Sequence, residues 1–173
     1  MSESAINTSQ NGAITAPKPG KGLVMGRRNY RLDPKRRFTI PSDWFESLGQ
    51  PTHLYIMPSL SDRPCLDVLT REDIDERMRP YRNRDMFDSD AASLVSSISE
   101  LITEVKVEAQ NRIRVTDSHL QFAQVKGEDV VLLGADNYFE IWSVENRPPP
   151  DGRETSIVSQ LRERVNLLKQ QKQ

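Results

Sequence analysis

The chain has 173 residues, of which 36% are hydrophobic and 28% are charged. No apolar run approaches the ~20 residues that a membrane-spanning helix needs, and residues 1–19 lack the apolar stretch of a secretory signal. The single cysteine, Cys65, excludes an internal disulfide, and with only His53 and His119 as histidines no metal site or cofactor is expected. These features predict a cytoplasmic protein with one domain or two small ones.

Charge is distributed unevenly along the chain. Residues 18–37 contain eight basic side chains and one acidic side chain, whereas residues 38–151 contain 11 basic and 21 acidic side chains. A basic block beside an acidic body indicates either a binding surface for a polyanion such as nucleic acid or a solvated basic arm.

In chain order, residues 1–22 have few large apolar side chains and are predicted to be a disordered N-terminal extension. Residues 26–72 are predicted to contain strands separated by an acid-to-arginine turn and a short helix. A helical linker is expected at 73–103, with Thr70 and Asp73 as a capping box for its first helix and a second helix over 89–102.

Residues 104–147 repeat the strand pattern of the first unit. The last segment, 148–173, begins with three consecutive prolines that end any strand or helix. Within it, Leu161, Val165 and Leu168 have the spacing of a weak amphipathic helix, which either packs on a neighbour or remains a solvated tail.

The two units align as an internal duplication. Residues 31–41 can be laid over residues 106–116 at an offset of 75, so that Asp33 meets Glu108 and Arg37 meets Arg112. The short helices at 42–48 and 117–123 also correspond, as do two later strands in each unit. Because four-strand units of this size cannot bury both faces alone, the two copies are predicted to complete one β-barrel-like core.

The acid-to-arginine turns are the candidate binding sites. A carboxylate four residues before an arginine can hold its guanidinium for bidentate contact with a phosphate or a guanine edge. A turn salt bridge without further function is the alternative. The candidate DNA-binding residues are Arg27, Arg28, Lys35, Arg36, Arg37, Arg112 and Arg114, and the candidate orienting acids are Asp33 and Glu108.

These turns, the run Gly127–Gly134 and the strand Phe139–Trp142 resemble the MraZ family of bacterial transcriptional regulators. The resemblance covers residues 26–146. It implies an α+β fold with two tandem SpoVT–AbrB-type domains, whose swapped hairpins form an intrachain pseudo-dimer. It also implies ring-shaped homo-oligomers that bind double-stranded DNA in the nucleoid, at the promoter of a division and cell-wall gene cluster that includes the family's own gene.

The sequence departs from the family pattern inside the turns. The family turn has glycine immediately before its arginine, where this chain has Arg36 and Asn111. Glycine tolerates a positive φ, whereas arginine does so at a cost of about 1 kcal/mol. Either the first turn differs in shape or added charge on DNA outweighs the strain.

No residue pattern supports an enzyme. Trp44 and Trp142 lie in apolar patterns typical of core anchors, and Cys65 begins an apolar strand as a buried structural thiol. A phosphate-binding glycine loop and a nucleophile elbow are both missing from the sequence. The rival hypothesis is a protein-interaction scaffold or an antitoxin-like protein that binds a partner through its tail.

Overall fold

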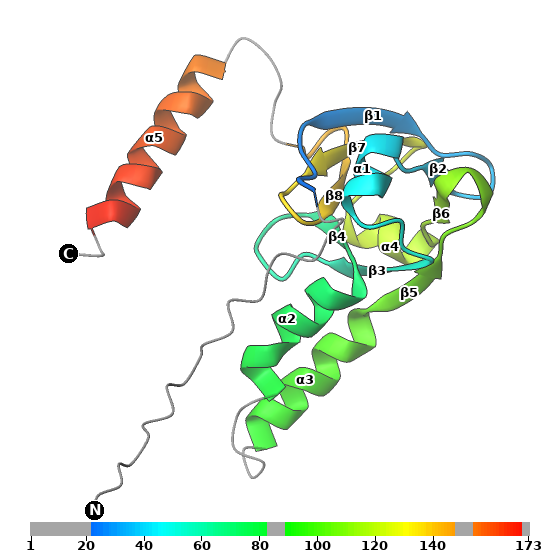
Figure 1. Cartoon of the computed structure of the whole chain (residues 1–173), viewed down its shortest axis with the longest axis horizontal. Coiled ribbons are helices and arrows are strands. Elements are labelled where there is room, and N and C mark those ends of the chain that lie inside the picture. The colour runs from blue at the N-terminus through cyan, green and yellow to red at the C-terminus, as the bar shows by residue number, and fades with distance from the viewer. Residues whose placement is uncertain (1–21, 83–88, 148–153, 171–173) are drawn as a thin grey trace, which may run out of the picture.

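The computed structural model describes residues 22–82, 89–147 and 154–170 (Figure 1). Almost all of the predicted N-terminal extension and the whole proline run therefore lie outside the described residues. The elements, in order, are β1 (Arg27–Arg31), β2 (Arg37–Thr39), α1 (Ser42–Ser47), β3 (His53–Pro58), β4 (Cys65–Leu69), α2 (Arg71–Arg82), α3 (Ser89–Leu101), β5 (Thr103–Lys106), the 3-10 turn η1 (Ala109–Asn111), β6 (Arg112–Arg114), α4 (Asp117–Phe122), β7 (Asp129–Gly134), β8 (Phe139–Ser143) and α5 (Glu154–Gln170).

Strands from the two halves of the chain interleave in one antiparallel sheet. The six-stranded sheet has the order β1-β7-β8-β4-β3-β5. Its first strand, from the N-terminal half, pairs with β7 from the C-terminal half, and β5 in turn pairs with β3. At the centre, β4 and β8 pair in a register that sets Asp67 opposite Glu140. Within each half only one hairpin forms in this sheet, β3–β4 in the first and β7–β8 in the second, and the pairings between halves join them.

The α+β class is confirmed, but the prediction of a barrel is wrong. The sheet is open, with β1 and β5 at its edges, and β2 and β6 form a separate two-stranded ladder. Each of these two strands has only three residues, after which Pro41 and Thr116 lead into α1 and α4. The β2–β6 ladder therefore covers the core through its side chains and is not hydrogen-bonded to the larger sheet as it would be in a closed barrel.

The main core fills the space between the sheet, the ladder and the short helices α1 and α4. Trp44, Phe38 and Phe139 are almost fully buried in it, with ring centroids 5.6 Å apart for Trp44 and Phe139 and 6.3 Å apart for Phe38 and Phe139. Trp44 also donates its indole N–H to the Met25 carbonyl at 3.0 Å, which satisfies its polar atom. The predicted roles of Trp44 and Trp142 as buried anchors are confirmed.

Helices α2 and α3 pack against each other over the opposite face of the sheet, and Figure 1 shows them projecting from it as a hairpin. The predicted capping box is present, because the backbone N–H of Thr70 donates to Asp73 and that of Asp73 donates to the Thr70 hydroxyl. The tail helix α5 lies apart from the rest of the fold in Figure 1. Among the described helices, none has the length and apolar content to span a membrane.

Candidate nucleic-acid interface

The first turn, between β1 and β2, is built around the Asp33 carboxylate. One oxygen accepts from the backbone N–H groups of Lys35 at 2.8 Å and Arg37 at 2.9 Å, and the other accepts from Arg37 Nε at 2.8 Å. The hydrogen bond from the Arg37 side chain is the main reason that the pKa of Asp33 lies below its ordinary value. The predicted orientation of Arg37 by Asp33 is therefore present.

Both turns use a left-handed backbone at the position where glycine was expected. Arg36 has a φ of 59° and Asn111 has a φ of 56°. The backbone hydrogen bond from Asp33 N to Arg37 O (2.9 Å) is matched by the one from Glu108 N to Arg112 O (2.7 Å). The first turn thus keeps its positive φ with arginine in place, at a conformational cost of about 1–2 kcal/mol.

The two turns meet because β2 and β6 pair with each other. Their antiparallel register sets Arg37 opposite Arg114, Phe38 opposite Ile113 and Thr39 opposite Arg112. Phe38 and Ile113 are buried in the core, so the alternating residues face outward. The outer face of this two-stranded ribbon consequently presents Arg37, Arg112 and Arg114, one arginine from the first half and two from the second.

Arg37 links the turns through two carboxylates. Its Nε and Nη2 contact Asp33 at 2.8 and 2.7 Å, and its Nη1 lies 3.0 Å from Glu108 Oε2. Both hydrogen bonds raise the pKa of Arg37, the one with Asp33 more than the one with Glu108. The Arg37 side chain is only 19% exposed. These carboxylates also offset the repulsion between Arg37 and Arg114, which are opposite each other on the ribbon.

The remaining basic groups of the turns face solvent. Lys35 and Arg114 are exposed, and Arg36 places its Nε 3.3 Å from Asp117 at the start of α4. Arg112 donates its Nε–H to the Ala109 carbonyl at 3.3 Å. Across residues 33–39 and 108–114 there are five basic and two acidic side chains, so this surface carries net positive charge.

Arg27 and Arg28 lie elsewhere, at the end of β1 that is distant from the turn. Adjacent residues of a strand point to opposite faces, so these two arginines do not share a surface. Arg28 forms an ion pair with Asp43 of α1 at 3.3 Å and stacks over Trp44, with its guanidinium carbon 5.6 Å from the ring centroid. The structure therefore groups the two turns but separates them from Arg27 and Arg28.

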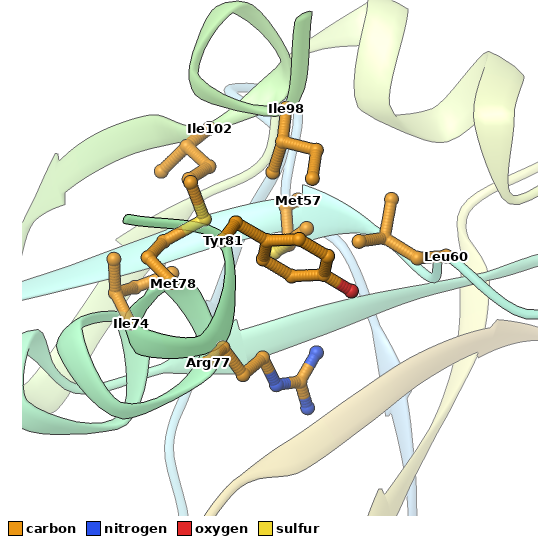
Figure 2. Close-up of a pocket in the computed structure, with 8 residues that line it drawn as sticks. All are labelled: Met57, Leu60, Ile74, Arg77, Met78, Tyr81, Ile98 and Ile102. Carbon is orange, nitrogen blue, oxygen red and sulfur yellow. The ribbon is translucent and has the colours of Figure 1, made fainter. Parts of the chain in front are cut away.

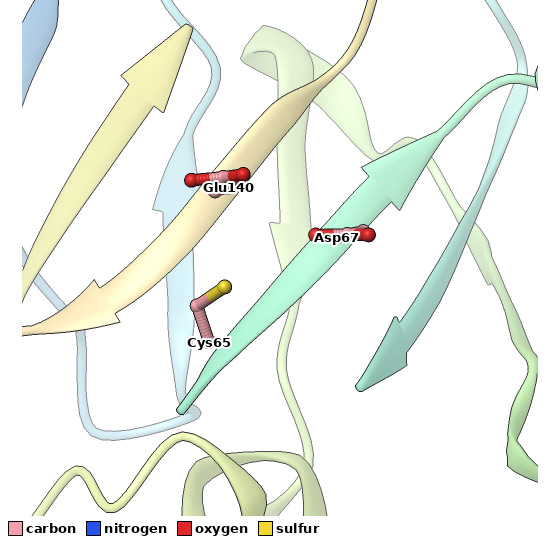
Figure 3. A group of neighbouring side chains, drawn as sticks. All are labelled: Cys65, Asp67 and Glu140. Atoms are coloured by element: carbon pink, nitrogen blue, oxygen red, sulfur yellow. The ribbon is translucent and has the colours of Figure 1, made fainter. Parts of the chain in front are cut away.

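One buried group has the spacing of metal ligands among the described residues. Cys65, Asp67 and Glu140 place one ligand atom each within 4.8 Å of one another on the sheet face opposite the main core (Figure 3). Both carboxylates are already neutralised, since Arg77 binds Asp67 and Arg63 lies 2.8 Å from Glu140. A cation here would meet two guanidiniums, so the group fits a buried ion-pair network better than a metal site.

Comparison with known proteins places the chain in a family. No family profile matches it. However, the Transcriptional regulator MraZ of Nitratidesulfovibrio vulgaris is 30% identical over 143 residues, which cover 80% of this chain and 87% of that protein. The chain belongs to the MraZ family.

More distant proteins with the same name extend this likeness. The Transcriptional regulator MraZ of Ureaplasma parvum is 22% identical over 143 residues, covering 83% of this chain and 97% of the relative. The one from Mycolicibacterium smegmatis is 24% identical over 123 residues, covering 71% and 82% respectively. The similarity to MraZ proteins therefore spans most of the chain.

Two contacts of this MraZ family member escape sequence reasoning. Glu108 was expected to orient the arginine of its own turn, yet it accepts from Arg37 of the other turn. Asp117 forms an ion pair with Arg36, which also lies in the other half of the chain. The only signal for either contact is the pairing of β2 with β6, which an alignment of the two repeats against each other does not reveal.

Proposed function

We propose that the chain is a DNA-binding transcriptional regulator that contacts double-stranded DNA through the β2–β6 ribbon and its two turns. The observation that carries the proposal is the ribbon register, which turns Arg37, Arg112 and Arg114 outward while Phe38 and Ile113 anchor the strands in the core. A two-stranded ribbon has the width that the major groove of B-DNA admits.

The proposed roles differ among the basic residues. Lys35, Arg36 and Arg114 contact phosphates or base edges directly, since their side chains extend into solvent or make a single, easily exchanged ion pair. Arg112 supports this contact from the adjacent ribbon position. Arg37 holds the two turns together with Asp33 and Glu108, and its own guanidinium contacts DNA only by exchanging one of these carboxylates for a phosphate.

Arg27 and Arg28 extend the positive surface along β1 as secondary phosphate contacts. Because they lie on opposite faces of β1, the two arginines add positive charge to two different surfaces beside the ribbon. We therefore expect their individual replacement to weaken binding less than replacement of Arg36 or Arg114.

We also propose that residues 26–72 and 104–147 are two SpoVT–AbrB-like domains of a swapped-hairpin pseudo-dimer, joined by the helical linker 73–103. Support comes from the pairings β1–β7, β3–β5 and β2–β6, each of which joins one half of the chain to the other. The proteins named Transcriptional regulator MraZ support regulation of transcription. The proposed target is the promoter of a division and cell-wall gene cluster containing the protein's own gene, bound in the cytoplasm at the nucleoid.

A ring-shaped homo-oligomer completes the proposal. One ribbon reaches only a few base pairs, whereas several copies on repeated sites raise overall affinity through effective concentration. The chain is not proposed to be an enzyme, in keeping with the names of its relatives.

The test compares two charge-neutralising variants, Arg114→Gln on the ribbon and Arg79→Gln on the exposed side of α2. Both lose one positive charge, so a general effect of net charge would weaken both equally. Binding to a promoter duplex is measured by fluorescence anisotropy over a salt series. We expect Arg114→Gln to lower the affinity and to reduce the salt slope by about one phosphate contact, while Arg79→Gln matches the native protein. Equal effects would contradict the ribbon as the binding surface.

A further inference from the structure

Helix α5 has an apolar face that nothing covers within the described chain. Val158, Leu161, Val165 and Leu168 are 42–61% exposed and follow the three- and four-residue spacing of one helical stripe. Helices in proteins gain most of their stability from packing such an apolar face. Packing against another apolar surface would therefore stabilise α5.

The charges beside the stripe argue against pairing of two α5 helices. Arg162 and Lys169 follow one edge of the stripe and Arg164 follows the other. In a parallel pair, Arg164 of one helix would face Lys169 of the other, and like charges at such positions disfavour association. Residues 38–151, in contrast, carry 21 acidic against 11 basic side chains. Helix α5 has three basic and two acidic side chains, so its small net positive charge is opposite in sign to that of the body.

A mainly apolar pocket opens between the helical hairpin and the loop after β3. Its apolar lining comes from α2, α3 and its end, β3 and the following loop, and consists of Met57, Leu60, Ile74, Met78, Tyr81, Ile98 and Ile102 (Figure 2). Arg77 also lines the pocket, and its guanidinium is bound to Asp67. Leu60, at the edge of the pocket, is 53% exposed. The pocket volume of about 70 Å³ is far below the roughly 300–1,000 Å³ of small-molecule sites. It is suited to an inserted apolar side chain, as in the recognition of a helix by a groove.

We propose that α5 of one copy docks on the α2–α3 pocket of a second copy, with Leu161 as the inserted side chain. Six residues lie between Arg147 and Glu154, and the seven Cα-to-Cα steps of a fully extended segment can span up to about 25 Å. The helix can therefore leave its own body and reach a neighbour. The docking supplies a contact for the proposed homo-oligomer, and it rests on that part of the proposed function.

The pocket lies on the hairpin, whereas the candidate DNA contacts lie on the β2–β6 ribbon. Self-assembly through α5 and DNA contact by the ribbon can therefore be tested separately. Exposed positions on both partners make the test feasible, because replacing Leu60 or Leu161 leaves the core unchanged.

The experiment uses cysteine cross-linking in the full-length protein without DNA. The native Cys65 is buried and burial raises the pKa of its thiol to about 12, so it does not compete. An untagged Leu60→Cys variant is mixed with a tagged Leu161→Cys variant under mild oxidation. The matched control replaces Leu161→Cys with Asn166→Cys, which lies on the other side of α5.

We expect a disulfide between the tagged and untagged chains to form about tenfold faster with Leu161→Cys than with Asn166→Cys, because docking raises the local thiol concentration.

Three results would overturn the proposal. One is equal rates for the two α5 positions. Another is efficient cross-linking of Leu161→Cys with itself, which would show α5–α5 pairing. The third is exclusive intrachain cross-linking in a dilute Leu60→Cys/Leu161→Cys double variant, which would show docking on the helix's own copy. Anisotropy measurements of the single variants on DNA, made in parallel, report on the ribbon independently.

Discussion

Replacement of Arg77 by methionine tests the buried ion-pair network at the centre of the sheet. Asp67 is 3% exposed at its side chain and accepts from Arg77 through one carboxylate oxygen, while its other oxygen has no hydrogen-bond partner among the described groups. Arg77→Met keeps the aliphatic packing and removes the charge. It leaves Asp67 beside the buried carboxylate of Glu140, directly opposite on the neighbouring strand.

Truncating one partner of a buried ion pair costs about 3–5 kcal/mol. Arg77 is about one-third exposed, so solvent already screens part of the interaction, and we expect a loss of about 2–3 kcal/mol at neutral pH. Part of that loss is unrelated to Asp67, because the Arg77 guanidinium carbon also lies 4.6 Å from the Tyr138 ring centroid. Contacts of this kind contribute about 0.5–1 kcal/mol.

A double-mutant cycle separates the two contributions. The free energy of unfolding is measured by urea denaturation for the native protein, Arg77→Met, Asp67→Asn and the double variant. In the Asp67→Asn background, Arg77→Met should cost only about 1 kcal/mol, which gives a coupling energy of about 1–2 kcal/mol. If Arg77→Met destabilises both backgrounds equally, the charge of Asp67 does not contribute and the reasoning is wrong.

The pH dependence provides an independent check. Burial raises the pKa of Asp67, and its bond to Arg77 opposes that rise, so Arg77→Met should raise the pKa further. Between the ordinary and the raised pKa, the folded state binds more protons than the unfolded state, and stability falls as pH rises. The deficit of Arg77→Met should therefore shrink as the pH is lowered from about 7 to about 5. A deficit that is constant over this range would argue against a buried charge.

Three further predictions concern single residues. Cys65, with its thiol pKa raised by burial to about 12, should resist a thiol reagent in the folded protein and react fully in guanidinium; rapid labelling of folded protein would contradict its burial. Because Arg36 has a positive φ, Arg36→Gly should be more stable in urea than Arg36→Ala by up to about 1 kcal/mol, and equal stability would argue against strain. Burial lowers the pKa of His119, so the unfolded state gains a proton first, and stability should fall below about pH 6.5. His119→Gln should reduce this loss of stability at low pH, and an unchanged pH profile would show that other groups cause it.

Local features of the fold could be predicted from the sequence because they depend on neighbouring residues. Thr70 and Asp73 marked the start of α2, and the apolar spacing over 89–102 matches α3 at Ser89–Leu101. The family pattern identified the turn position that favours a positive φ but left open whether Arg36 would adopt it; the structure shows a positive φ at both Arg36 and Asn111. Caps, helix periodicity and turn geometry are all set within a few residues along the chain.

Strand partners could not be predicted, since periodicity identifies a strand without saying which edge it joins. Periodicity alone therefore did not reveal that Arg37 donates to Glu108 of the other turn. It also did not reveal that the six-stranded sheet is open. Arg27 and Arg28 were grouped with the turns by charge alone, although the two-residue period of a strand already sends adjacent side chains to opposite faces. Asp67 and Glu140 lie in strands that correspond in the two units, but the repeat does not identify their partners, because Arg63 comes from the loop before β4 and Arg77 from α2.

Sequence preference of the ribbon and its turns for DNA can be measured by fluorescence anisotropy. The purified protein is titrated onto the duplex upstream of its own gene and onto a shuffled duplex of equal length, across a salt series. We expect tight, strongly salt-dependent binding to the native duplex and weaker binding to the shuffled one. Equal binding to both duplexes would show that the basic surface binds DNA without sequence preference, and no binding to either would show that the ribbon is not a DNA-binding surface.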